Sequence, residues 1–423
     1  MDNKDCKEYF GTEKDQKHNL ILYMFDGITF MPSMALLSVA TVIPFFLEQL
    51  GASTFQIAMS ATLATLCVFA SQPFLGSVAS RTRVMSKTFG KILMSKRLFF
   101  FVFVLCIPIF TPYPALLVWI FLIAWGIFNF FAGAGSVFNP PLIMKLLPPD
   151  KRAGMRGIGF AVGNIIGVGM AALIPVILGG IAFPYNFMFV FSLGLFFLFL
   201  NAACFLLMRE HEDVEPRVPM KVVEYVKSIP ECLRADAIFR TMIFTCMFMV
   251  IANTFIPFYT LYAIRTFFIT ESHIATLTTL TIVSGIFVNI VFGFIVDRKG
   301  PVKVAPVAAC FVILAGAIAL FANSFTHIIA VWIFAHLGSG IYMKTANLML
   351  GEVSPSSKLP LYTGIFSSVT MALPSIFVLL FSSVVEYTGF SILFIIVFFC
   401  GVISLLINLF VFQKQLQSRN NAA

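Results

Sequence analysis

Ionisable side chains are rare in the apolar stretches of this chain, so the few that occur there are its best candidates for chemistry. Asp26 is followed by Thr29 and Ser33 at spacings of three and four, which places all three on one face of a helix. A carboxylate within a lipid-spanning segment is costly and marks a functional site by default. Asp26 is therefore a candidate to take up and release a proton. The alternative is that it reaches the headgroups from a position near the interface.

A second polar face is expected near the end of the chain. His336, Gly340, Lys344 and Asn347 share one side of a helix, with His336 close to the bilayer midplane. His336 is a second proton candidate, and Lys344 could pair with Asp26 or with an anionic group of a solute. The alternatives are a histidine that hydrogen-bonds a neighbouring helix and a lysine that extends to the interface.

Motifs for covalent chemistry are absent from the sequence. It contains no His-Glu-x-x-His, no Gly-x-Ser-x-Gly and no Cys-x-x-Cys. The segment 338–345 (GSGIYMKT) resembles a phosphate-binding loop, but Met343 stands where that loop requires Gly. The eight cysteines imply no disulfide framework. We expect no enzyme, no cofactor, no metal site and no ATP-driven pump.

The elements that position these residues are expected to be membrane-spanning helices. The chain has 423 residues, of which 59% are hydrophobic and 11% charged, against about a quarter charged in soluble domains. Uncharged stretches reach or exceed the roughly 20 apolar residues that cross a bilayer as a helix. The twelve expected spans cover residues 20–46, 55–78, 94–112, 115–144, 157–180, 187–208, 241–264, 273–296, 304–322, 328–350, 361–384 and 391–412.

Basic residues predict the orientation of these spans, because short loops rich in Lys and Arg stay in the cytoplasm. Placing both termini inside leaves Arg265 as the only basic residue that faces out. The net charge of +9 is therefore a signal of topology, and we expect no nucleic-acid partner. The short outer loops lack any Asn-x-Ser/Thr acceptor, which favours a bacterial cytoplasmic (inner) membrane.

An internal repeat divides the chain into halves. Gly76 and Arg81 close the second span as Gly293 and Arg298 close the eighth, and a long polar segment separates the sixth span from the seventh. Within that segment, residues 222–233 have the spacing of a helix that lies on the membrane surface. The expected domains are a cytoplasmic tail (1–19), a six-helix bundle (20–208), a cytoplasmic linker (209–240), a second six-helix bundle (241–412) and a cytoplasmic tail (413–423).

The segment after the eighth span resembles the signature of the major facilitator superfamily, Gly-x-x-x-Asp-Arg/Lys-x-Gly-x-x-Lys/Arg. Its matching residues in GFIVDRKGPVK are Gly293, Asp297, Arg298, Gly300 and Lys303. The copy after the second span keeps Gly76 and Arg81 but has Ser80 in place of Asp and Arg83 in place of Gly. These departures, together with Asn129 where many members carry Arg, leave the subfamily open.

The resemblance implies an all-α membrane protein with twelve helices in two pseudo-symmetric six-helix bundles. It also implies that spans one, four, seven and ten line a central cavity. The additional residues expected to line it are Asn129 and Ser136 of span four and Asn253, Tyr259 and Thr260 of span seven. Asp297 would act with Arg298 as a cytoplasmic gate; the alternative is a turn that only anchors the chain. In span five, the four-residue spacing of Gly159, Gly163 and Gly167 favours close packing between helices.

The expected function is secondary active transport of a small organic solute by alternating access, coupled to protons. The alternatives are an uncoupled facilitator and a transporter-like membrane sensor that moves nothing. The expected partners are the solute, protons and the lipid bilayer, and the chain is expected to function as a monomer.

Overall fold

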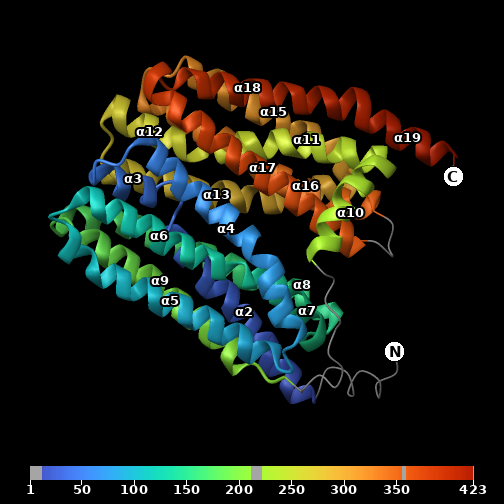
Figure 1. Cartoon of the computed structure of the whole chain (residues 1–423), viewed down its shortest axis with the longest axis horizontal. Helices are drawn as coiled ribbons and strands as arrows, with labels where there is room; N and C mark the ends of the chain where they lie inside the picture. Colours follow the sequence, from blue (N-terminus) through green and yellow to red (C-terminus); the bar gives the residue numbers. More distant parts are fainter. Residues whose placement is uncertain (1–11, 211–221, 355–358, 423) are drawn as a thin grey trace. The chain divides into compact units, whose positions relative to one another are not determined.

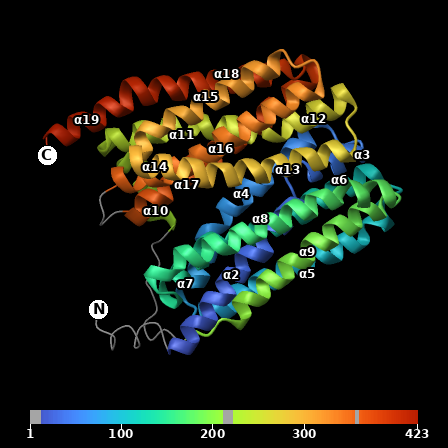
Figure 2. The same cartoon turned by 180° about the vertical axis from the view of Figure 1, so that it is seen from behind.

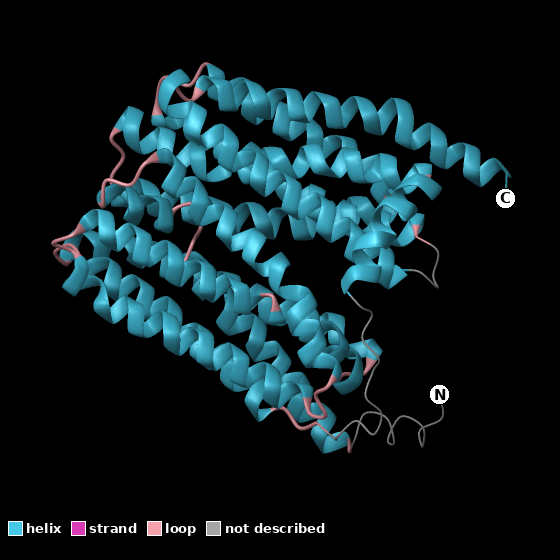
Figure 3. Ribbon diagram, viewed as in Figure 1, coloured by secondary structure: helices cyan, strands magenta, loops and turns pink. Residues whose placement is uncertain are grey.

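A computed structural model describes residues 12–210, 222–354 and 359–422, and these form helices without any strand (Figure 3). Twelve stretches of helix in this described part are long and apolar enough to cross a membrane, which confirms the predicted all-α membrane architecture. Short turns at 111–113, 181–184 and 321–324 separate consecutive spans. Residues 355–358, between the expected tenth and eleventh spans, lie outside the described residues, as do parts of the expected N-terminal tail and linker.

The chain divides into two compact units, of which the first runs from blue to green in Figure 1 and the second from yellow to red, apart from the blue segment 52–66. Unit 1 covers Met1–Gly51 and Cys67–Met220, and unit 2 covers Ala52–Leu66 and Lys221–Ala423. The helices of unit 1 are α2 (Glu13–Leu36), α3 (Val42–Gln49), the second half of α4 (Thr54–Ser80), α5 (Met85–Phe110), α6 (Pro114–Ala132), α7 (Ala134–Leu146), α8 (Pro149–Gly180) and α9 (Tyr185–Leu207).

Unit 2 holds the remaining helices and the first half of α4. They are α10 (Val222–Ala235), α11 (Ala237–Thr254), α12 (Ile256–Phe267), α13 (Glu271–Phe287), η1 (Val288–Phe292), α14 (Gly293–Lys299), α15 (Pro301–Leu320), α16 (Phe325–Val353), α17 (Leu359–Thr388), α18 (Ser391–Leu406), η3 (Ile407–Phe412) and α19 (Gln413–Ala422). The helix expected over residues 222–233 is present as α10.

Three predicted spans are broken into two helices each. Span one ends at Leu36 instead of residue 46, and α3 begins separately with Pro44 in its first turn, where a residue without an N–H fits. Span four breaks at Gly133, which packs so closely on Ser71 and Val68 of α4 that a Cβ there would collide with them. Span seven breaks at Phe255, directly before Pro257 in the first turn of α12.

Two spans of unit 2 contain a π-helical segment. Span eight passes through η1 between α13 and α14, and span twelve passes through η3 between α18 and α19. Such segments are rare and frequently occur at functional sites, because the extra residue per turn shifts backbone carbonyls out of the regular ladder. Span eight was predicted as one continuous helix over 273–296, and periodicity alone does not reveal this insertion.

Glycines allow the closest helix contact in unit 1. A Cβ at Gly163 would meet the backbone of Gly27 in α2, and one at Gly159 would meet the carbonyl of Met24. The glycine spacing of span five therefore serves packing between α2 and α8, as small residues do in membrane helices. Helices α5 and α9 lie side by side in both views (Figures 1 and 2). Their pairing forms the other side of the site described next.

Candidate functional site

Asp26 lies in a buried polar network inside unit 1. Its side chain is buried, and its Oδ1 accepts a hydrogen bond of 2.6 Å from Nδ2 of Asn201 in α9. The Asn201 Oδ1 in turn accepts a bond of 2.7 Å from Nη2 of Arg97 in α5, and Arg97 Nη1 donates to the carbonyl of Leu198. The Asn201 amide of α9 thus bridges the Asp26 carboxylate of α2 and the Arg97 guanidinium of α5.

Two buried cations of α5 accompany this carboxylate. Arg97 is only 2% exposed, and the neighbouring Lys96 is also buried, with its Nζ 4.4 Å from the centre of the Phe128 ring. A third cation, Arg156 of α8, lies over the rings of Tyr23 in α2 and Phe160 in α8. A buried cation needs a compensating charge or an aromatic face, because desolvation costs several kcal/mol per ion. The ionisation of Asp26 therefore bears directly on the charge balance of this bundle.

The other polar residues predicted in spans one and four are held by their own helices. Thr29 donates to the carbonyl of Phe25, and Ser33 donates to the carbonyl of Phe30. Asn129 is buried and donates to the carbonyl of Trp125. Ser136 lies in α7 and accepts a bond of 3.1 Å from Nε2 of Gln72 in α4. Thr29 also lies 3.3 Å from the backbone carbonyl of Asp26, but no bond of these four residues reaches the Asp26 carboxylate within the described part of the chain.

His336 lies in a network between α16 and α13 of unit 2. Its Nδ1 donates to the carbonyl of Trp332 at 3.0 Å, and its Nε2 lies 3.2 Å from the hydroxyl of Thr281. That hydroxyl also accepts from the indole Nε1 of Trp332 and lies 3.0 Å from the carbonyl of Leu277. The Thr281 proton can point to Nε2 or to Leu277, so the network satisfies either a neutral or a protonated imidazole.

Lys344 and Asn347, on the same face of α16 as His336, extend this contact to the π-helical segment. Lys344 Nζ donates to the backbone carbonyl of Asn289 in η1 at 3.1 Å. A Cβ built on Gly293 would lie 3.0 Å from that ammonium, so the lysine uses space that a larger residue at position 293 would fill. Asn347 is exposed and donates to the carbonyl of Met343. The predicted polar face of span ten thus packs along span eight.

The three residues predicted in span seven surround the break between α11 and α12. Tyr259 is 1% exposed, stacks on Phe394 at 5.5 Å, and has no hydrogen-bond partner for its hydroxyl within the described residues. Asn253 and Tyr259 both line a small pocket that α15 and α16 also border. Thr260 is fully buried. Span seven therefore contributes a buried phenol and an amide beside a cavity of unit 2.

The motif after span eight forms a tight turn at the end of α14. Asp297, Arg298 and Lys303 are exposed, and Gly300 has a φ of 79° and a ψ of 153°, a conformation that is essentially restricted to glycine. Its N–H caps the helix on the carbonyl of Val296. The ion pairs found in the described ranges do not include Asp297.

The first copy of the motif, after span two, has no such turn glycine. Gly76 is half-buried and has open space around its Cα, and Arg81 is exposed. Within the described parts of the chain, no group of three or more His, Cys, Asp or Glu side chains could hold a metal ion.

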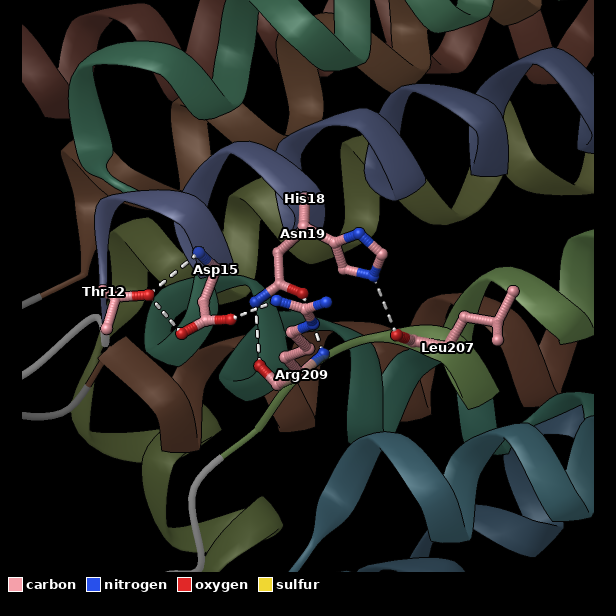
Figure 4. A network of polar contacts seen from close by, with 6 residues as sticks. All are labelled: Thr12, Asp15, His18, Asn19, Leu207 and Arg209. Carbon is pink, nitrogen blue, oxygen red and sulfur yellow. Dashed lines mark hydrogen bonds and ion pairs between the residues drawn. The ribbon is translucent and has the colours of Figure 1, made fainter.

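Figure 4 shows a second polar network, which joins the start of α2 to the end of α9. Arg209 Nη1 pairs with Asp15 Oδ1 at 2.9 Å, and its backbone N–H and carbonyl make a reciprocal pair with the side chain of Asn19, each bond at 2.9 Å. His18 Nε2 donates to the carbonyl of Leu207. These contacts fix the end of α2 that precedes Asp26 against the same helix that carries Asn201.

Sequence reasoning missed Lys96, Arg97 and Asn201 as parts of the site. Both cations lie within the expected third span, 94–112, in the run LMSKRLFFF that opens an apolar stretch. Asn201 is a polar residue in the otherwise apolar run LFLNAAC. An isolated amide deep in a span indicates a hydrogen bond between helices, so the sequence alone could have pointed to Asn201.

The comparisons with known proteins agree with this architecture. The family model described as Major Facilitator Superfamily matches residues 241–422. No curated protein matches the chain. A crystal structure of a mutant of the nucleoside transporter NupG is similar with a TM-score of 0.69 at 12% identity, covering 95% of this chain and 99% of that one.

Two further solved structures share the fold. One is a POT family transporter in complex with a thioalcohol-conjugated peptide (TM-score 0.67, 13% identity, 97% and 98% of the two chains). The other is a bacterial homologue of the iron transporter ferroportin (TM-score 0.66, 12% identity, 93% and 98%). At these identities the likeness concerns the fold, and the matched family concerns the second half of the chain. The second half of the chain thus matches the Major Facilitator Superfamily model, and the chain as a whole has the fold of these membrane transporters.

Proposed function

We propose that this protein is a proton-coupled secondary transporter that moves a small organic solute by alternating access. The observation that carries the proposal is the buried Asp26, bonded through Asn201 to Arg97. An ionisable group inside a membrane span is expensive to maintain and typically marks a proton relay or a solute pathway. Protonation of Asp26 would leave Arg97 without its counter-charge, so a proton on this carboxylate would change the energy of the contact between α2, α5 and α9.

His336 is proposed as a second proton station. The Thr281 hydroxyl can donate to the neutral ring or accept from the protonated ring, so either form keeps its hydrogen bonds. Asp26 and His336 belong to different units of the chain. Alternating access in repeat-built transporters arises from motion of one half against the other, and coupling requires that proton occupancy favour one arrangement.

The arrangement proposed around these residues follows the sequence. The two bundles comprise residues 20–208 and 241–412, and residues 209–240 link them. Both termini are proposed to lie in the cytoplasm. The protein is proposed to function as a monomer in a bacterial inner membrane. The polar residues of spans one, four, seven and ten are proposed to line the solute pathway. Asp297 and Arg298, with the turn at Gly300, are proposed to form the cytoplasmic gate.

A different function is favoured by one feature of the same network. Asn201 bridges Asp26 and Arg97, and such a bridged pair would also be present if Asp26 served only to stabilise the buried Arg97. In that case the protein is an uncoupled facilitator, which equilibrates its solute without regard to the pH gradient. The two functions make opposite predictions for a variant that cannot be protonated at position 26.

The experiment begins with a solute found by thermal-shift screening of the purified protein and confirmed by counterflow in proteoliposomes. Asp26→Asn should abolish solute-driven proton flux while counterflow of the solute continues. A wild-type protein that transports with no proton flux, or an Asp26→Asn protein with unchanged flux, would support the facilitator. Tight binding without any counterflow would instead indicate a sensor.

A double variant separates a proton carrier from a structural charge. Asp26→Asn alone leaves Arg97 buried without a carboxylate, whereas Asp26→Asn with Arg97→Gln restores neutrality. If Asp26 carries the proton, the double variant regains thermal stability but shows no coupled flux. Recovery of both stability and coupled flux would show that Asp26 only balances Arg97.

A further inference from the structure

Lys344 carries a positive charge in span ten that no carboxylate neutralises within the described residues. The ion pairs found there, Lys17–Glu13, Lys145–Glu210 and Arg209–Asp15, all belong to unit 1. The next acidic residue on α16 is Glu352, eight residues further and about 12 Å along the helix. Charged groups at such depth pair with another charge or with backbone carbonyls. Lys344 has only the carbonyl, so its charge remains available.

The ammonium group is held in place by the π-helical segment of span eight. It donates one of its three N–H groups to the carbonyl of Asn289 at 3.1 Å and lies over Gly293. One turn earlier on α16, Gly340 packs against Val288 of η1, which brings the two helices together at this point. Among the described residues, the other two N–H groups of this half-exposed cation have no hydrogen-bond acceptor. A preorganised donor of this kind binds a partner with less loss of entropy than a mobile surface lysine.

Two asparagines are close to this cation: Asn289 supplies the backbone carbonyl that it contacts, and Asn347 follows Lys344 by three residues on the same face of α16. Asn289 and Asn347 are both exposed, and Asn347 uses one of its two N–H groups on the carbonyl of Met343. Ionisable side chains within spans face the bundle interior or a water-filled cavity, and Lys344 is such a side chain. The three residues therefore define an accessible polar patch on α16 and η1 of unit 2, with one positive charge and spare amide donors.

The geometry points to this patch, formed by Lys344, Asn289 and Asn347, as a binding site for a carboxylate group of the transported solute. A single ammonium suits a single negative charge, and amide N–H groups can complete the hydrogen bonds of a carboxylate. A phosphate would call for a planar arginine fork or for further cations, which the patch lacks among its described residues. The inference rests on the proposed transport function and specifies the class of solute.

The test compares carboxylates with their neutral amides in proteoliposome counterflow. The probes are benzoate and benzamide, nicotinate and nicotinamide, and N-acetylglycine and its amide. The acid of at least one pair should exchange while its amide does not. Lys344→Met should raise the KM for that acid on the order of 10- to 100-fold, as expected for loss of a charged hydrogen bond. Lys344→Arg should keep most of the affinity, and Asn347→Leu should raise the KM by a smaller factor.

The matched control is Lys414→Met, which removes an exposed lysine of α19 and should leave the KM unchanged. Thermal unfolding of each variant verifies that it is folded. Exchange restricted to the amides, no exchange of any acid, or an unchanged KM in Lys344→Met would overturn the carboxylate site. Proton-driven exchange of the amides would overturn the carboxylate site but leave the proposed proton-coupled transport intact. Exchange of an acid without proton flux would overturn the proposed proton coupling but leave the carboxylate site intact.

Discussion

The side-chain amide of Asn201 donates to the carboxylate of Asp26 across 2.6 Å, from a position 175 residues later in the chain. The same amide accepts from Arg97 through its oxygen. Its two ends have opposite hydrogen-bonding character, so it fits between an acceptor-only carboxylate and a donor-only guanidinium. Asn201 thereby connects α2, α5 and α9 at one buried point, and the stability of this contact depends on it.

We predict that Asn201→Leu destabilises the protein by about 2–4 kcal/mol, because it leaves a buried carboxylate and a buried guanidinium without their shared partner. Thermal unfolding of the detergent-solubilised protein measures the effect. The control is Leu200→Ala on the same helix, where the side chain is 42% exposed and should contribute little. Equal melting temperatures for Asn201→Leu and wild type would contradict the bridging role.

The two motif glycines near the ends of spans two and eight should respond differently to substitution. Gly300 has a φ of 79° and a ψ of 153°, so Gly300→Ala should cost about 1–3 kcal/mol through backbone strain. Gly76 lies within α4 with nothing near its Cα, so Gly76→Ala should be neutral or slightly stabilising. Unfolding measurements on the two variants provide the comparison, and equal effects would exclude backbone strain as the reason for Gly300.

Much of this architecture could be predicted from apolar runs and charge positions. The twelve spans and the helix at 222–233 follow from local composition, which the structure confirms. The breaks are less visible, because Gly133 interrupts span four through its contact with Ser71, a residue on another helix. The π-helical segment at 288–292 likewise has no periodic signature strong enough to read.

The polar contacts were the least predictable part. Spacing placed His336, Gly340 and Lys344 correctly on one face, and that face packs along span eight. Spacing cannot say which neighbour a face will meet, because that depends on pairing between distant segments. The partner of Asp26 is such a case, since nothing local to span one indicates Asn201.

The Thr281 hydroxyl orients both His336 and Trp332, so its removal should be felt at both. We predict that Thr281→Val lowers stability by about 1–2 kcal/mol, since the indole N–H of Trp332 loses its acceptor in a buried position. Thermal unfolding together with the tryptophan emission spectrum reports the change. Thr276→Val, on the exposed side of the same helix, is the control and should alter neither. An unshifted spectrum and melting temperature in Thr281→Val would argue against this network.

Glu210 provides the last prediction, because it ties three elements of unit 1 together where α9 ends. Its Oε1 pairs with Lys145 of α7 at 2.8 Å, and its Oε2 accepts at 2.6 Å from the N–H of Ser86 in the first turn of α5. The carboxylate is fully buried by its neighbours. Glu210→Ala should therefore destabilise the protein by about 3–5 kcal/mol, as expected when one partner of a buried pair is removed.

The matched control for Glu210 is Glu13→Ala, which breaks the exposed pair between Glu13 and Lys17 at 3.8 Å. Both variants remove one negative charge, so a general effect of net charge would change the two melting temperatures alike. We expect Glu13→Ala to match the wild type and Glu210→Ala to melt at a clearly lower temperature. Added salt should leave the difference in place, because screening acts weakly on buried pairs. A difference that disappears in about 0.5 M salt, a concentration of the order at which surface pairs are screened, would place Glu210 among the surface charges instead.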